Sequence, residues 1–212
     1  MYRQRFLSLF FIVLSFCVIN LSGARAEIIE DKHYTILTKP QPTEGGAKIE
    51  VLEFFWYGCP HCNSLHPHLK AWLTDIPDDV SFRFVPANLR PSWVAGAKIF
   101  YTLEAIGKID TLHDLVYDAI HRDKIDLHQD AVLFDWIEKQ GVNREQFENA
   151  YNSFSVQNQV TKSTQIVRQY QLNGVPSLVV NGKYLTSGGM NSTPQGTVET
   201  LKALIEKARQ ER

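Results

Sequence analysis

The sequence predicts an α/β fold in which a mixed central sheet is covered by helices and interrupted by an inserted helical block. A strand, a helix and a second strand succeed one another over residues 48–85, and a strand hairpin and a helix close the chain. Such an order makes a small mixed sheet with helices on its faces. We therefore divide the chain into an export signal at 1–26, a sheet domain formed by 27–89 and 171–212, and a helical domain at 90–170 inserted between its halves.

The first 26 residues have the pattern of a secretory signal peptide. Arg3 and Arg5 give a positive start, residues 6–19 are an apolar run, and Ala24-Arg25-Ala26 supplies the small residues of a cleavage site. A retained membrane anchor is the alternative, but the run is shorter than the roughly 20 residues that span a bilayer. We expect cleavage before Glu27.

Removal of this segment leaves a mildly acidic chain. It takes away three of the 22 basic residues and none of the 23 acidic residues, so the remaining charge is about −4. Surfaces that bind nucleic acid carry basic patches. We therefore expect no nucleic-acid partner.

The first part of the exported chain predicts an edge strand and a central strand. Residues 33–37 form the edge strand, and a loop rich in proline and glycine follows. Residues 48–57 are almost continuously apolar, which is typical of a strand buried on both faces.

A helix and a further strand follow this central strand. Residues 62–74 have helical spacing, and Pro60 stands where a first helical position favours proline. Pro67 is expected to kink the helix, because its ring removes a backbone donor. Residues 80–85 alternate like a strand.

The second half of the chain predicts a helical series, a hairpin and a last helix. Asn181-Gly182 between two strand-like runs is a strong hairpin signal, and Thr193 caps the last helix, as Asn143 caps an earlier one. The predicted helices cover 94–106, 111–120, 132–140, 144–151, 156–170 and 194–209, and the predicted hairpin strands cover 177–180 and 183–186.

Cysteine usage points to redox chemistry. Cys17 leaves with the signal peptide, so only Cys59 and Cys62 remain, three positions apart. Exported proteins often use disulfides for stability, but a bridge that encloses so little chain constrains the unfolded state least. The pair therefore needs a reason other than stability.

The position of Cys59 at the start of a helix predicts its chemical role. Unpaired amide donors and the helix dipole favour a thiolate there and lower its pKa. Cys62 lies one turn further in and is close enough to attack a mixed disulfide on Cys59. We predict that Cys59 exchanges with the substrate and that Cys62 resolves.

The residues between the two cysteines are expected to set the direction of exchange. His61 adds a donor or a cation beside the Cys59 thiolate. Stabilising the reduced form makes the disulfide a stronger oxidant, so Pro60 and His61 favour donation of disulfides. The alternative is that His61 is an ordinary exposed histidine.

Zinc is the main competing interpretation of the same segment. Cys59, Cys62, His66 and His68 offer four ligands, and Cys62 and His66 share a helix face. His68 points elsewhere, however, and no second ligand cluster completes a tetrahedral site. We therefore expect no metal, and we place His66 and His68 on the surface or in a groove.

Two further features lie near the cysteine pair in the predicted fold. Glu53 is an acid inside an apolar strand; if it is buried, its pKa rises, and it can tune the thiols or relay a proton. The alternative is an edge or solvent-facing glutamate. Pro176 begins a strand directly after Val175. The Val175-Pro176 peptide bond can be trans, which is ordinary at the start of a strand, or cis, which is unusual and usually serves a function.

The run Phe54-Phe55-Trp56-Tyr57-Gly58-Cys59-Pro60-His61-Cys62 resembles the DsbA family of periplasmic thiol:disulfide interchange proteins. Gly174-Val175-Pro176-Ser177 and Val180-Asn181-Gly182-Lys183 strengthen the resemblance, which extends from about Tyr34 to the last helix. It implies a thioredoxin-like fold with an inserted helical domain. It also implies a periplasmic location and a redox-active Cys59–Cys62 disulfide as the active group, with no other cofactor.

The resemblance also implies roles for other residues and for partners. Val175-Pro176 matches a cis-proline loop that holds substrate, and Glu53 matches a buried acid whose basic partner falls at about Arg83. An apolar surface around Trp56, Tyr57 and Pro176 would bind reduced, unfolded exported proteins. A membrane quinone reductase of the DsbB type would regenerate the disulfide of a monomeric protein.

These observations favour a protein disulfide oxidase over two alternatives. One is an isomerase or reductase of the same fold, although isomerases of this compartment are usually dimers with a separate dimerisation domain, for which we see no room. The other is a non-catalytic chaperone-like binder or zinc carrier. The redox potential and a Cys59→Ser variant distinguish the three.

Overall fold

The computed structural model describes residues 27–212; the predicted signal peptide lies outside the described residues. The described chain forms one five-stranded mixed sheet and seven α-helices. The predicted α/β architecture is therefore confirmed. None of the helices in this part of the chain is long and apolar enough to cross a membrane.

The sheet has the order β1-β5-β4-β2-β3, with the longest strands at one side. The β2 and β3 strands are parallel, and the other neighbours are antiparallel. The β3 strand is an outer strand, and β2 is the central strand that leads to the cysteines. The strands are β1 (Thr35–Ile36), β2 (Ile49–Phe55), β3 (Val80–Pro86), β4 (Ser177–Val180) and β5 (Tyr184–Ser187).

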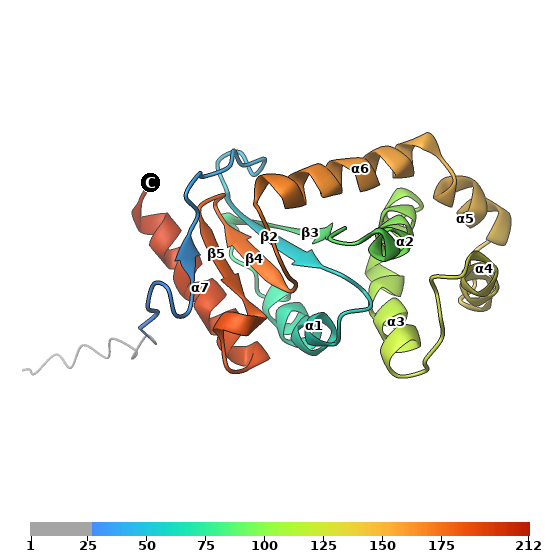
Figure 1. Cartoon of the computed structure of the whole chain (residues 1–212), viewed down its shortest axis with the longest axis horizontal. Helices are drawn as coiled ribbons and strands as arrows, with labels where there is room; N and C mark the ends of the chain where they lie inside the picture. Colours follow the sequence, from blue (N-terminus) through green and yellow to red (C-terminus); the bar gives the residue numbers. More distant parts are fainter. Residues whose placement is uncertain (1–26) are drawn as a thin grey trace, which may run out of the picture.

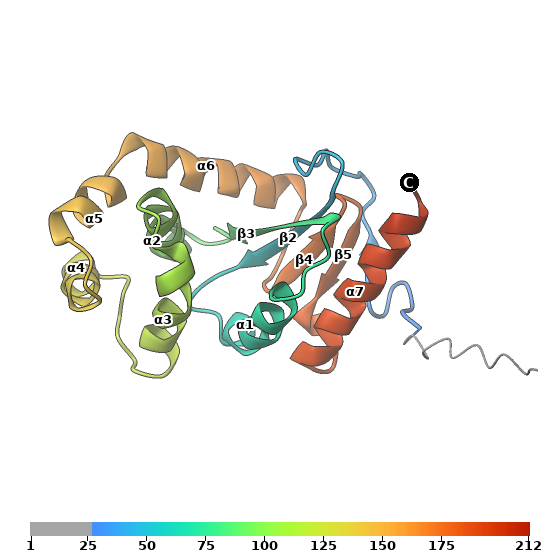
Figure 2. The same ribbon diagram turned by 180° about the vertical axis from the view of Figure 1, so that it is seen from behind.

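Helices cover both faces of the sheet (Figures 1 and 2). The helices α1 (Pro60–Leu73) and α7 (Pro194–Gln210) pack against Val51 on one face, and the end of α6 (Phe154–Gln169) packs against Leu52 on the other. Successive strand residues point to opposite faces, so burial of both faces explains the continuous apolar run of β2.

The remaining helices form a block beyond the end of β2 and β3 (Figure 1). The long α6 helix runs back from this block to the sheet. The block has its own core, to which the sheet contributes Phe55 and the following turn contributes Tyr57. Besides α6, the helices of the block are α2 (Val94–Ala105), α3 (Ile109–His121), α4 (Asp130–Lys139) and α5 (Arg144–Tyr151). A 3₁₀ turn, η1 (Pro91–Trp93), precedes them.

Local signals place most of these elements where the sequence predicts them. The β4–β5 hairpin turns at Asn181-Gly182, both with positive φ, and a Cβ on Gly182 would collide with the backbone of Gln41. Asn143 and Thr193 cap α5 and α7 through their side-chain oxygens. A second 3₁₀ turn, η2 (Gly188–Met190), connects β5 to α7.

Some boundaries differ from the prediction for identifiable reasons. The central strand ends at Phe55 and not at residue 57, because the Cys59 amide donates to the Trp56 carbonyl in a turn. The α6 helix begins at Phe154, since Ser153 accepts a hydrogen bond from the Val156 amide and acts as its N-cap.

Candidate active site

The Cys59-Pro60-His61-Cys62 motif lies where β2 turns into α1, as the sequence predicts. Cys59 is the N-cap of α1, and Pro60 is its first residue. The backbone of Cys59 is extended, and its Sγ accepts a hydrogen bond from the Cys62 amide at 3.4 Å. The sulfur therefore takes the place that a serine or aspartate oxygen takes in ordinary helix caps.

The surroundings of Cys59 favour its thiolate. Both cysteines are free thiols in this structure. The Cys62 thiol donates a hydrogen bond to Cys59, the amides of Cys62 and His61 donate further bonds, and the His61 charge adds to them. Burial opposes these effects, but the pKa of Cys59 still falls from 9.0 to about 6.

Cys62 is in the opposite situation. Its side chain is fully buried, whereas Cys59 keeps a small exposed fraction of 7%. Burial, the hydrogen bond to Cys59 and the nearby Cys59 charge raise the pKa of Cys62 well above 9.0. At neutral pH the reduced pair therefore holds an anion on Cys59 and a proton on Cys62.

The loop before β4 lies directly against Cys59. The Val175-Pro176 peptide bond is cis. The local sequence was compatible with either cis or trans, whereas the resemblance implied cis. The Cys59 thiol is 3.5 Å from the Val175 carbonyl oxygen, to which it can donate. The Pro176 ring is buried and packs near Gly188.

Glu53 is buried beneath the cysteine pair. Its side chain is 1% exposed, and neither carboxylate oxygen has a hydrogen-bond partner among the described residues. Burial, and then the Cys59 charge, raise its pKa from 4.5 to about 8. The alternative of a solvent-facing glutamate is therefore wrong.

Arg83 is not the partner of Glu53, contrary to the expectation from the resemblance. In the β2–β3 register Arg83 lies opposite Leu52, while Phe84 lies opposite Glu53. Adjacent positions on a strand face opposite sides of the sheet. Arg83 instead pairs with Glu44 at 3.1 Å and Glu50 at 3.7 Å.

Tyr57 does not belong to an exposed substrate surface, so that prediction is wrong. Its side chain is 1% exposed, and its hydroxyl lies 2.7 Å from Nδ1 of His113. The His121 Nε2 lies 2.7 Å from the Tyr57 carbonyl oxygen. Beyond the end of β2 the Tyr57 side chain turns into the core of the helical block, where it joins α3 to the active-site turn.

Trp56 does lie at the surface, and it is half-buried. Its indole stacks on that of Trp93 at a centroid distance of 4.3 Å and an interplanar angle of 4°. Both the indole and His128 line a hollow of about 510 Å³. A Cβ on Gly58 would collide with this indole, which explains why a glycine precedes Cys59.

The other histidines near α1 have partners away from the cysteines. His66 is buried, with its Nε2 2.7 Å from Asp114, and His68 lies 3.1 Å from Gln195 on α7. Residues 27–212 contain no cluster of three or more metal-ligating side chains. His113 was not predicted as a site residue, since a histidine within an amphipathic helix does not reveal from the sequence whether it faces the core.

Comparisons with known proteins agree with this geometry. Residues 50–201 match the family model described as the DSBA-like thioredoxin domain. The thiol:disulfide interchange protein DsbA of Azotobacter vinelandii is 39% identical over 87% of this chain and 86% of its own length. That of Pseudomonas aeruginosa strain PAO1 is 38% identical over 84% of each chain.

Solved structures with these names are also similar. A crystal structure of Pseudomonas aeruginosa DsbA has a TM-score of 0.82 and 37% identity, and the match covers 87% of this chain and 96% of that one. The oxidoreductase NmDsbA1 from N. meningitidis has a TM-score of 0.77 and 29% identity, covering 88% and 96%.

Proposed function

The chain belongs to the DsbA family of thioredoxin-like proteins, and from this premise we propose that Cys59 and Cys62 form its redox centre. It is a thiol:disulfide oxidoreductase that donates disulfides to other proteins. The observation that carries the assignment of the centre is the stabilised Cys59 thiolate at the start of α1, with a pKa of about 6. Stabilising the reduced form drives the disulfide toward donation.

The proposed reaction proceeds through a mixed disulfide on Cys59. A substrate thiolate attacks Cys59 Sγ, the Cys59–Cys62 bond breaks, and Cys62 leaves with the electron pair and takes up a proton. A second substrate thiolate then attacks the substrate sulfur, and Cys59 leaves as a thiolate. The substrate dithiol is oxidised to a disulfide, the cysteine pair is reduced, and one proton goes to solvent.

Three neighbouring residues would adjust this centre. Pro60 sets the first turn of α1, and His61 contributes its amide and its charge to the Cys59 thiolate. Glu53 is close enough for its charge to raise the pKa of Cys62. We assign to Glu53 the exchange of a proton with Cys62 when that sulfur leaves or attacks, since both have a raised pKa.

Substrate would lie against the cis-proline loop and the indole of Trp56. A polypeptide bound at the Val175 backbone, beside Pro176, would place its cysteine at Cys59. Backbone bonds and apolar contact tolerate many sequences, which suits reduced, unfolded chains as clients. This assignment leaves Tyr57 out, because its side chain is buried.

The proposal extends to the cellular setting of the reaction. Residues 1–26 would direct export to the periplasm and be cleaved before Glu27. The exported chain would act as a monomer, with 27–89 and 171–212 as its thioredoxin-like domain and 90–170 as the inserted helical domain. A membrane quinone reductase of the DsbB type would reoxidise the cysteine pair, which needs no other cofactor.

Replacing each cysteine by serine tests the assigned roles. A Cys62→Ser variant, supplied with oxidised glutathione as the oxidant, should accumulate mixed disulfides between Cys59 and reduced client proteins, visible on non-reducing gels. A Cys59→Ser variant should lose disulfide transfer completely. Retained transfer in Cys59→Ser, or absence of adducts in Cys62→Ser, would refute the roles.

A redox titration separates the oxidase from a reductase or isomerase of the same fold. Equilibration with glutathione buffers should give a potential well above that of thioredoxin, which is about −270 mV. A value near that of thioredoxin would leave the cysteine roles intact but reverse the direction of transfer. Client binding that is equal in the parent and in Cys59→Ser, with no disulfide transfer by the parent, would indicate a chaperone-like binder.

A further inference from the structure

The outer side of β3 has backbone groups without partners. The Ala87 amide donates to the Phe55 carbonyl and the Ile49 amide donates to the Asp79 carbonyl, so the odd-numbered residues of this strand face β2. Backbone groups alternate along a strand, so those of Phe82 and Phe84 face away from the sheet. They make no hydrogen bond to another described residue. Such an edge can accept a further strand.

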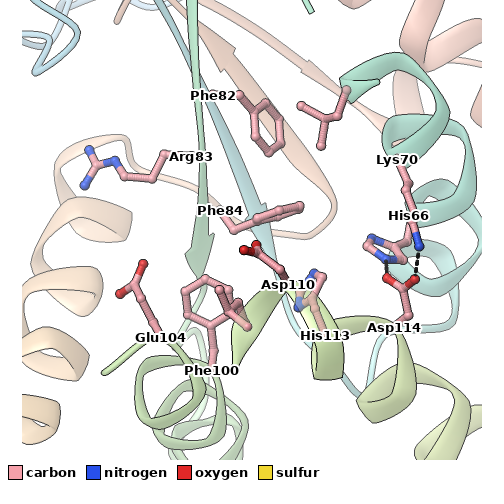
Figure 3. A pocket seen from close by; sticks show the side chains of 12 residues that line it. His66, Lys70, Phe82, Arg83, Phe84, Phe100, Glu104, Asp110, His113 and Asp114 are labelled. Atoms are coloured by element: carbon pink, nitrogen blue, oxygen red, sulfur yellow. Dashed lines mark hydrogen bonds and ion pairs between the residues drawn. The ribbon is translucent and has the colours of Figure 1, made fainter. Parts of the chain in front are cut away.

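A groove of about 320 Å³ lies at this edge, between β3 and the helices α1, α2 and α3. Aromatic side chains form much of its lining: Phe82 and Phe84 from β3 and Phe100 from α2 (Figure 3). Its volume is at the small end of ligand pockets, which are roughly 300–1,000 Å³. It therefore suits a side chain or two of an extended segment and not a folded domain.

The charges at the rim of the groove favour a cation. Lys70 is paired with Asp114, which also binds His66, and Arg83 is paired with Glu44 and Glu50 (Figure 3 shows the contacts of Asp114). Both basic residues of the lining are therefore already neutralised by acids.

Two acids of the lining have no such partner. Glu104 on α2 and Asp110 on α3 make no ion pair with another residue in 27–212. Partial burial raises the pKa of Glu104, although the Arg83 charge counteracts this effect. Asp110 lies in the first turn of α3. Figure 3 shows both carboxylates reaching into the groove from their helices.

The lining also contains a buried polar atom without a partner. The Nε2 of His113 makes no hydrogen bond to a described residue, and burial lowers the pKa of this histidine to about 3, so it is neutral. Its Nδ1 is bonded to the Tyr57 hydroxyl. If the Tyr57 hydroxyl donates to Nδ1, that hydrogen bond satisfies both atoms, and the single ring hydrogen of the neutral His113 lies on Nε2. This N–H has no acceptor among the described residues.

We propose that this groove binds an extended, basic peptide segment, which adds to the free edge of β3 and places a lysine or arginine side chain between Glu104 and Asp110. The apolar stem of that side chain would lie on Phe84 and Phe100. The α1 residues of the groove, His66 and Lys70, lie six and ten residues after Pro60, which is about 9 and 15 Å along a helix. The groove is thus separate from Cys59, and its occupation does not depend on the proposed redox role.

A capped peptide tests this assignment. The probe is acetyl-Thr-Val-Thr-Lys-Thr-Val-Thr-amide, whose lysine and two valines share one face when extended. Titration of the reduced protein by nuclear magnetic resonance should shift the amide signals of Phe82 and Phe84 at saturable peptide concentrations. Replacing the peptide lysine by glutamate, or methylating alternate backbone amides, should each weaken binding at least tenfold.

Protein variants identify the groups that bind. The double variant Glu104→Gln, Asp110→Asn should weaken peptide binding at least tenfold while leaving oxidation of a small dithiol unchanged. The control is Glu138→Gln, Glu145→Gln, which removes the same charge from α4 and from the first turn of α5. This control should bind like the parent.

Several outcomes would overturn the inference. Equal binding of the glutamate peptide, or an equal loss in both double variants, would remove the role of Glu104 and Asp110. Binding that survives backbone methylation would exclude strand addition. Shifts confined to the neighbourhood of Val175 would place the peptide at the redox site instead.

Discussion

At the residue scale, the two cysteines differ because one sulfur caps a helix and the other lies inside it. The Cys59 thiolate accepts hydrogen bonds from the first turn of α1, whereas burial and the neighbouring Cys59 anion oppose ionisation of Cys62. Three positions of chain thus separate a sulfur that leaves readily from one that holds its proton. This difference gives the exchange its order, with Cys59 outward and Cys62 inward.

The first prediction concerns the ionisation of Cys59. The ultraviolet absorbance of the thiolate in the reduced protein should titrate with a midpoint of about 6. In His61→Ala the midpoint should rise but stay below the ordinary value, because the Cys62 thiol, and not His61, is the largest cause of the shift. The oxidised protein, which has no thiol, is the control. A midpoint near 9.0 in the parent protein would contradict the prediction.

The same ionisation makes the stability of the reduced form depend on pH. A pKa that is lower in the folded state adds stability above the unfolded value and loses it as pH falls through the folded value. Relative to the oxidised form, the reduced form should therefore become more stable as pH rises from about 6 to 9.0. Urea unfolding of both forms at pH values across this range measures the difference, and a constant difference would refute the prediction.

The next prediction concerns Glu53, whose pKa is raised and not lowered. Its carboxyl binds a proton up to pH about 8 when folded but only to 4.5 when unfolded, so the parent loses stability as pH rises between these values. Each unit of difference between the folded and unfolded pKa changes the free energy of unfolding by about 1.4 kcal/mol. In Glu53→Gln this loss is absent, so the stability of the variant relative to the parent should increase by about 5 kcal/mol between pH 4.5 and 8.

Denaturant titrations of both proteins across that range check the prediction. Glu50→Gln is a matched control on the same strand: its carboxyl is also buried, but it accepts a bond from the Glu44 amide and lies near Arg83. Its pH-dependent effect should be smaller. An unchanged difference between Glu53→Gln and the parent across the range would show that Glu53 titrates normally.

The sequence revealed the chemistry of these residues better than their directions. The Cys-Pro-His-Cys spacing and an acid in an apolar strand were enough to single out the cysteines and Glu53. The direction of Tyr57 was not readable, because the strand ends at Phe55 and the alternation of faces ends with it. Arg83 was wrongly paired with Glu53 although it lies on a regular strand. A shift of one position in the assumed register moves a side chain to the other face of the sheet.

At the scale of elements, α1 depends on the residue that also performs the proposed chemistry. Cys59 is the N-cap, and its sulfur accepts from the Cys62 amide at 3.4 Å. Serine at this position can make the same bond with its oxygen, whereas alanine has no acceptor. The start of the helix and the reactivity of the thiolate thus share one hydrogen bond.

This sharing predicts an order of stability among inactive variants. Cys59→Ala should be less stable than Cys59→Ser by about 1 kcal/mol, the usual cost of removing a cap. Neither variant can form the Cys59–Cys62 disulfide, so the comparison isolates the cap. Thermal or urea unfolding under reducing conditions measures it, and equal stability would mean that the sulfur contributes nothing to the start of α1.

Elements were predictable where a single residue determines a boundary. Asn181-Gly182, Asn143 and Thr193 each placed a turn or a cap correctly, because the geometry needs that residue type locally. The start of α6 was missed because its first residue, Phe154, is 79% exposed and adds nothing to an apolar pattern. The packing of the helical block against Phe55 depends on contacts between distant segments, which no local pattern contains.

At the scale of the whole molecule, the active-site turn joins the sheet to the helical block. Tyr57 bonds to His113 and His121 of α3, and Phe55 packs into the core of the block. The α6 helix forms a second connection, since its end packs on the opposite face of β2. A molecule connected in this way should unfold in one transition and not block by block.

The Tyr57→Phe variant tests this connection. Loss of the hydroxyl leaves both ring nitrogens of buried His113 without partners in the described chain, which costs about 1–3 kcal/mol. Urea unfolding should show this loss equally by indole fluorescence, which follows Trp56, Trp72, Trp93 and Trp136 together, and by far-ultraviolet circular dichroism. The control is Tyr34→Phe, a buried tyrosine of the other core whose hydroxyl makes no bond to a described residue; its effect should be smaller. If the two signals of Tyr57→Phe separate, the helical block unfolds independently, and the turn that carries Cys59 is then held by the sheet alone.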